Sequence, residues 1–172
     1  MIIWITGLSA AGKTSIGKSI YDIWKDQNTA TVLVDGDEVR KILKHDDHTQ
    51  DYTLDAREII AMKIHNLCAW LDSQNINVVC CTNSHFEHLR QLNRSTFSGY
   101  YEVYVSVPME VLYDRDTKDL YKPAMRGDIE NVIGVDIPFS PPKNPDLIID
   151  NGATCQDFEP LARQILAGAG VV

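Results

Sequence analysis

The sequence predicts a three-layer α/β fold, in which a five-stranded, mostly parallel sheet lies between helices on both faces. Three observations predict it. Short apolar runs alternate with segments of helical periodicity, the apolar runs lack polar alternation, and a glycine-rich loop follows the first run. Strands that helices cover on both faces have such continuous apolar sequences. The length of 172 residues is typical of one domain, so residues 1–172 are expected to form a single unit.

The elements follow from the same patterns. Strands are expected at residues 2–6, 31–34, 76–81, 100–107 and 147–149. Helices are expected at residues 13–26, 38–44, 54–74, 86–96, 108–115 and 154–166. In the first helix Ile16, Ile20 and Trp24 share one face, and Thr53 is a typical N-cap for the long third helix. Residues 45–51 are polar and predict a loop.

Composition and charge exclude several classes of protein. The formal net charge is −8 at pH 7, which argues against a protein that coats nucleic acid or binds anionic membranes. No apolar run approaches the ~20 residues of a membrane span. No signal-peptide pattern is present, so a cytoplasmic protein is expected. The cysteines Cys68, Cys80, Cys81 and Cys155 form no C-x-x-C pair and predict small apolar residues in a reducing compartment.

The loop after the first strand carries the most specific motif. Residues 7–14 match the phosphate-binding pattern G-x-x-x-x-G-K-[ST], after an apolar strand and before a helix. In this context Lys13 reaches the β- and γ-phosphates of ATP, and the Thr14 hydroxyl ligates Mg²⁺. The sequence therefore predicts ATP and Mg²⁺ as cofactors, with these ATP-binding residues in the loop: Gly7, Leu8, Ser9, Ala10, Ala11, Gly12, Lys13, Thr14 and Ser15.

The second strand ends in an acidic motif. Asp35 and Asp37 flank Gly36, and Arg40 follows one turn later. The carboxyl ends of strands in parallel sheets point into the ligand crevice. We therefore expect one of the two carboxylates to orient or deprotonate an acceptor hydroxyl, and Arg40 to bind an anionic group of the acceptor.

Residues 116–145 hold five prolines and many charges without clear periodicity, and they predict a long, mobile lid without regular structure. A basic lid suits an enzyme that covers phosphates and excludes water during transfer. Its cations are Lys118, Lys122, Arg126 and Lys143, with Arg115 directly before it, and Arg115 and Arg126 are expected on the ATP side.

Together these segments resemble the adenylylsulphate kinases, P-loop kinases that phosphorylate the 3′-hydroxyl of adenosine 5′-phosphosulfate with Mg-ATP. The resemblance spans nearly the whole chain and is most specific in residues 115–122, 127–129 and 134–138. It implies that Asp35 is the catalytic base and that Lys13 is the second catalytic residue. Members of this family often form dimers, so the resemblance also implies a possible homodimer. The acceptor-binding residues it implies are Asp37, Arg40, Tyr52, Arg57, Asn83, Ser84, Lys118 and Lys122.

The chain departs from the family pattern on the acceptor side. The family's Phe-Ile-Ser-Pro stretch reads Thr82-Asn83-Ser84-His85, its acceptor-side asparagine aligns with Ile60, and a base-stacking phenylalanine of the lid aligns with Val132. Loss of one aromatic wall weakens base stacking by roughly 1–3 kcal/mol. Two acceptors therefore stay open: adenosine 5′-phosphosulfate, or another nucleotide such as a cytidine diphosphate derivative carrying a phosphoramidate in capsule or natural-product biosynthesis. A nucleotide-gated binding module or a pseudo-kinase would show no acceptor-dependent ATP consumption.

Overall fold

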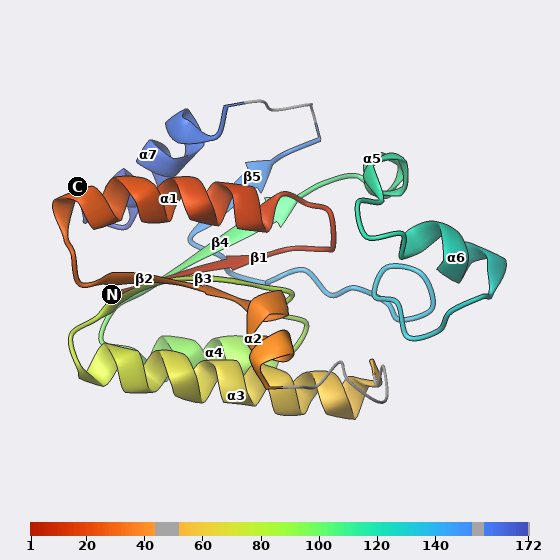
Figure 1. Ribbon diagram of the computed structural model, residues 1–172, viewed down its shortest axis with the longest axis horizontal. Coiled ribbons are helices and arrows are strands. Elements are labelled where there is room, and N and C mark those ends of the chain that lie inside the picture. Colours follow the sequence, from red (N-terminus) through yellow and green to blue (C-terminus); the bar gives the residue numbers. More distant parts are fainter. Residues whose placement is uncertain (44–51, 153–156, 172) are drawn as a thin grey trace.

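The computed structural model describes residues 1–43, 52–152 and 157–171, and its centre is a five-stranded, all-parallel sheet (Figure 1). The strand order is β2-β3-β1-β4-β5, and every pair of neighbours runs parallel. The strands are β1 Ile2–Thr6, β2 Thr31–Asp35, β3 Asn77–Thr82, β4 Tyr100–Ser106 and β5 Leu147–Asp150. The predicted α/β class is confirmed.

Helices cover both faces of the sheet (Figure 1). Helices α1 (Lys13–Gln27) and α7 (Glu159–Gly168) pack together on one face. Helices α3 (Leu54–Ser73) and α4 (Glu87–Thr96) pack together on the other. The short helices are α2 (Gly36–Ile42), α5 (Met109–Arg115) and α6 (Tyr121–Arg126), and all three lie at the end of the sheet that holds the carboxyl ends of the strands (Figure 1).

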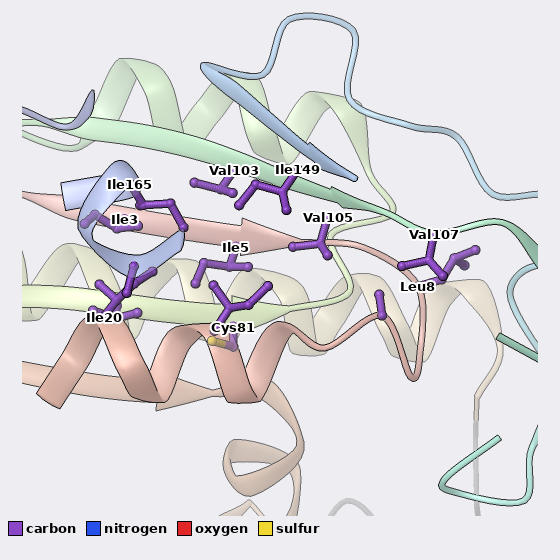
Figure 2. Close-up of a cluster of buried hydrophobic side chains, with 14 of the residues drawn as sticks. Ile3, Ile5, Leu8, Ile20, Cys81, Val103, Val105, Val107, Ile149 and Ile165 are labelled. Atoms are coloured by element: carbon purple, nitrogen blue, oxygen red, sulfur yellow. The ribbon is translucent and has the colours of Figure 1, made fainter. Parts of the chain in front are cut away.

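The sheet has an apolar core on each of its two faces, because successive strand residues point to opposite faces. Ile3 and Ile5 of β1 belong to the core beneath α1 and α7 (Figure 2), whereas Ile2 and Trp4 belong to the core beneath α3. Helix α1 approaches the sheet closely at Gly17, where an added Cβ would lie 2.1 Å from the sulfur of Cys81. This close packing fixes the start of α1, and with it the preceding loop, against the sheet.

The prediction that residues 116–145 lack regular structure is wrong. They contain helix α6, and Ile133 and Ile137 form an isolated bridge. The carboxylate of Asp116 starts the helix by accepting backbone N–H bonds from Leu120, Tyr121 and Lys122 at 2.8–3.0 Å. Tyr121 is buried and anchors the segment to the protein, since its hydroxyl donates to the carbonyl of Ser9 at 2.9 Å.

Other boundaries differ by a few residues. Helix α2 begins at Gly36 rather than residue 38, because the Asp35 carboxylate accepts the N–H of Asp37 and caps the first turn. Helix α7 begins at Glu159 rather than residue 154, although residues 153–156, with Cys155, lie outside the described ranges. The loop predicted at residues 45–51 lies outside them too. Thr53 caps α3 as expected, with its hydroxyl accepting from Ala56.

In the part of the chain that the structure describes, no helix combines the length and the apolar character needed to cross a bilayer.

Candidate active site

The glycine-rich loop links the carboxyl end of β1 to the first turn of α1 and has a tightly curved backbone. Ala10 and Gly12 adopt left-handed conformations, with φ of 60° and 96°. An added Cβ on Gly12 would lie 2.7 Å from the Asn151 side-chain nitrogen, and one on Gly7 would lie 2.6 Å from a β4 carbonyl oxygen. Only glycine fits at these two positions. Alternating backbone conformations of this kind direct N–H groups inward and form an anion-binding nest at a helix N-terminus.

Lys13 follows the loop and is shielded by it. Its ammonium donates a hydrogen bond to the Leu8 carbonyl at 2.7 Å. Burial, and then the charge of Lys118, lower the Lys13 pKa from 10.5 to about 8. Near neutral pH the Lys13 ammonium is therefore charged, but the protein neutralises its positive charge only in part. The negative charge of an incoming phosphate would stabilise the charged ammonium.

The Lys13 pKa predicts a pH dependence of ATP binding. An anion stabilises the ammonium, so the pKa of Lys13 rises on binding, and ATP binds with proton uptake above about pH 8. Above that pH, ATP affinity is expected to fall by up to about tenfold per pH unit. Calorimetric titrations from pH 7 to 9.5 measure this dependence. Lys13→Arg, which stays charged, is the control and should give a flatter profile; an equally flat profile in the wild type would contradict the prediction.

Thr14 and Asp35 meet beside Lys13. The Thr14 hydroxyl donates to one carboxylate oxygen of Asp35 at 2.7 Å, and the other oxygen caps α2 through the N–H of Asp37 at 2.9 Å. The capping bond fixes the carboxylate at the end of β2. Hydroxyl and carboxylate oxygens are the ligands that Mg²⁺ prefers, so this pair fits the metal that the phosphate loop implies.

Asp37 joins α2 to the 116–145 segment. Its carboxylate accepts a hydrogen bond from the Lys118 ammonium. Burial acts to raise the pKa of Asp37, but the hydrogen bond and charge of Lys118 outweigh it, and the net pKa is lowered. The ion pair therefore holds the basic segment across the opening between β2 and the phosphate loop.

A cavity of about 750 Å³ adjoins Lys13 and extends between α3 and the 116–145 segment. Its volume is in the range of small-molecule sites. Tyr52 lines it near two cations, with the guanidinium carbons of Arg40 and Arg57 lying 5.7 Å and 5.2 Å from the ring centroid. Arg57 is held in place by bonds to the carbonyls of Tyr52, at 2.8 Å, and Asn131, at 2.7 Å.

Aliphatic side chains also line the cavity. Ile60 and Ile64 line it from α3, and Val132 and Ile133 line it from the 116–145 segment. Ile60 and Val132 are among the positions where the sequence departs from the family pattern. Among the described residues that line the cavity, Tyr52 is the one phenylalanine, tyrosine or tryptophan, and His85 adds an imidazole ring.

Most of the predicted acceptor residues come together here. Those that line the cavity are Asp37, Arg40, Tyr52, Arg57, Asn83 and Lys118, together with Ser9 and Lys13 of the phosphate loop. Ser84 does not line it: this residue is buried, and its backbone bonds to Thr6 and Arg90. Lys122 lies outside the lining too.

The two arginines expected on the ATP side lie in different surroundings. Arg115 lies behind the phosphate loop and donates to the carbonyl of Asn151 at 2.8 Å, whereas Arg126 is exposed and pairs with Asp128 at 2.8 Å. Asn151 itself donates to the Ala11 carbonyl at 2.8 Å and is a site residue that the sequence interpretation missed. It was missed because it carries no motif of its own and reaches the loop only through the fold.

This phosphate loop, with an acidic strand end beside its lysine and an adjoining acceptor cavity, defines a P-loop phosphotransferase. The comparison with known families is specific: residues 1–150 match the sequence model of adenylylsulphate kinase. The chain belongs to the adenylylsulphate kinase family and is a phosphotransferase that acts on a hydroxyl acceptor.

Individual relatives divide between two substrates. A cytidine diphosphoramidate kinase of Campylobacter jejuni is 39% identical over 150 residues, which cover 87% of this chain and 85% of that protein. An adenylyl-sulfate kinase of Halothermothrix orenii is 35% identical over 145 residues, covering 84% and 77%. The Mycobacterium tuberculosis APS kinase, solved with AMPPNP and APS, has the same fold, with a TM-score of 0.85 and 24% identity over 98% of this chain and 96% of that chain.

Proposed function

We propose that the protein transfers the γ-phosphoryl group of ATP to a ribose hydroxyl of a nucleotide in the 750 Å³ cavity. We further propose that this acceptor is a cytidine diphosphate derivative of the cytidine diphosphoramidate type. The observation that carries the proposal is the position of the cavity, which shares Lys13 with the phosphate loop. An acceptor there lies next to the phosphate that is transferred.

On the ATP side, the backbone of residues 7–12 holds the phosphates and Lys13 neutralises the charge that develops on the β- and γ-phosphates. Thr14, with Asp35 beside it, would hold Mg²⁺, which would supply further neutralisation of the phosphate oxygens. Asp35 orients the acceptor hydroxyl and takes its proton as the new P–O bond forms and the bond to ADP breaks. Phosphoryl transfer needs little more than this positioning and charge neutralisation.

On the acceptor side, Tyr52 offers one stacking face for the base, and Arg40 and Arg57 offer charge for the 5′-phosphates. The 116–145 segment contributes the aliphatic side chains of Val132 and Ile133 to the lining. A single aromatic wall penalises a purine more than a pyrimidine, because a purine has the larger stacking surface to leave unpaired. This supports a cytidine nucleotide, as does the 39% identity to the Campylobacter enzyme.

Adenosine 5′-phosphosulfate is the second candidate. Tyr52 also stacks on adenine, Arg57 also binds a phosphosulfate, and 35% identity links the chain to an adenylyl-sulfate kinase. Both candidates use the same phosphate loop and the same base.

Steady-state kinetics with Mg-ATP compare the two directly. We expect kcat/KM for cytidine diphosphoramidate to exceed that for adenosine 5′-phosphosulfate by at least about tenfold, a difference of about 1.4 kcal/mol in transition-state stabilisation. Cytidine diphosphate and uridine diphosphate serve as reference acceptors. The reverse preference would assign adenosine 5′-phosphosulfate and overturn the cytidine proposal, while leaving the phosphotransferase class untouched.

A further inference from the structure

The turn after β3 directs two side chains into the cavity and one away from it. Ser84 is the residue that does not line the cavity, and it is buried in the protein interior. Its N–H donates to the Thr6 hydroxyl at 3.1 Å, and its carbonyl accepts from the buried guanidinium of Arg90. The N–H of His85 donates to the carbonyl of Asn83 at 3.1 Å and closes the turn. With Ser84 anchored, Asn83 and His85 on either side of it both line the cavity.

Both of these side chains hold a polar atom that nothing in the described ranges satisfies. The side-chain oxygen of Asn83 and the Nδ1 atom of His85 are shielded from solvent, and neither has a hydrogen-bond partner among the described residues. A buried polar atom without a partner costs about 1–3 kcal/mol. Because both residues line the cavity, a ligand there is in a position to supply what they lack.

The chemistry of these two atoms selects the kind of group that fits. The amide oxygen of Asn83 accepts hydrogen bonds and donates none. Burial, and then the charges of Arg57 and Arg90, lower the pKa of His85, so its ring is neutral near pH 7. In the tautomer that carries the proton on Nε2, the Nδ1 atom accepts a hydrogen bond. Sulfate and phosphate oxygens are acceptors as well and cannot satisfy the Asn83 oxygen. An amino group carries two N–H donors, one for each orphan atom.

We propose that Asn83 and His85 together bind an amino group of the acceptor nucleotide and so determine which acceptor is used. This inference rests on the proposed function and deepens it. The amino group has two possible sources on a cytidine diphosphoramidate, namely the amine on phosphorus and the exocyclic amine of the base. The shared chemistry is a neutral –NH₂ donor placed beside the anion-binding Arg57.

The test is calorimetric binding without ATP, which separates it from turnover. Three ligands are compared: cytidine diphosphoramidate, cytidine diphosphate, which lacks the amine on phosphorus, and uridine diphosphoramidate, which lacks the base amine. The wild type is expected to bind the first about tenfold more tightly than one of the other two, and that analogue identifies the source of the amine. Equal affinities for all three, within about twofold, would overturn the proposal.

Variants then assign the preference to the two side chains. Asn83→Leu and His85→Phe keep the shape and remove the acceptor atoms, so each is expected to reduce the tenfold preference to about threefold or less. His88→Phe is the matched control, because His88 lies one turn further on, 60% exposed and paired with Glu58, and it should keep the full preference. If both variants keep the wild-type preference, the assignment is wrong. Amine-selective binding without phosphoryl transfer would instead count against the proposed function alone.

Discussion

Replacing Asp35 by asparagine is expected to lower kcat by about 10²- to 10⁴-fold, with KM for ATP and acceptor changed by less than about threefold. Asparagine keeps the shape: its amide oxygen can still cap α2 and its amide nitrogen can donate to the Thr14 hydroxyl, but it removes the charge that takes the proton. Fold and binding should therefore survive while the chemical step slows. Initial rates at saturating concentrations of both substrates measure the effect on kcat. Thermal melting of the variant checks that it is folded.

Asp37→Asn is the matched comparison for this prediction. Asp37 lies two residues further on, lines the acceptor cavity and pairs with Lys118, whereas Asp35 faces Thr14. Its loss should raise KM for the acceptor by weakening the contact with the 116–145 segment and leave kcat within about tenfold of the wild type. If Asp37→Asn lost more kcat than Asp35→Asn, the proton-accepting role would move to Asp37.

Replacing Lys13 by alanine is expected to reduce turnover by about 10³-fold or more, the larger end of what removal of one preorganised charge costs. The Lys13 ammonium is the cation that the phosphate loop itself holds, through the Leu8 carbonyl, at the entrance to the cavity. Single-turnover rates with saturating Mg-ATP measure the loss directly.

Lys18→Ala provides the control for that substitution. Lys18 is exposed on the same helix, one and a half turns after Lys13, and is not among the described residues that line the cavity. It should retain wild-type turnover. A Lys13→Ala protein that kept more than about a tenth of the wild-type rate would show that phosphate neutralisation comes from elsewhere, and Lys118, which also lines the cavity, would then be the residue to test.

Local sequence patterns predicted the fold well, because each core strand is a continuous apolar run and each long helix has a clear period. The phosphate loop was predictable for the same reason, since its glycines and lysine are contiguous and their spacing has one physical explanation. Helix α6 was not predictable from periodicity. It is only six residues long, contains Pro123, and depends on the Asp116 carboxylate and on burial of Tyr121.

The acceptor cavity was predictable in part. Asp37, Arg40 and Arg57 were found through motifs that resemble a family, and the structure brings them together around Tyr52. The role of Ser84 was harder to foresee, because the direction of a turn residue depends on partners such as Arg90 that are distant from any motif. The orphan atoms of Asn83 and His85 become visible only once burial and hydrogen bonding are known.

The most direct test of the account is whether ADP formation depends on a nucleotide acceptor. Wild-type protein is incubated with Mg-ATP carrying labelled γ-phosphate, with and without cytidine diphosphoramidate or adenosine 5′-phosphosulfate, and the labelled product is identified by mass spectrometry. We expect one ADP for each acceptor phosphorylated on its ribose, and little ADP without acceptor. Equal ADP formation with and without acceptor, with the label released as inorganic phosphate, would contradict it.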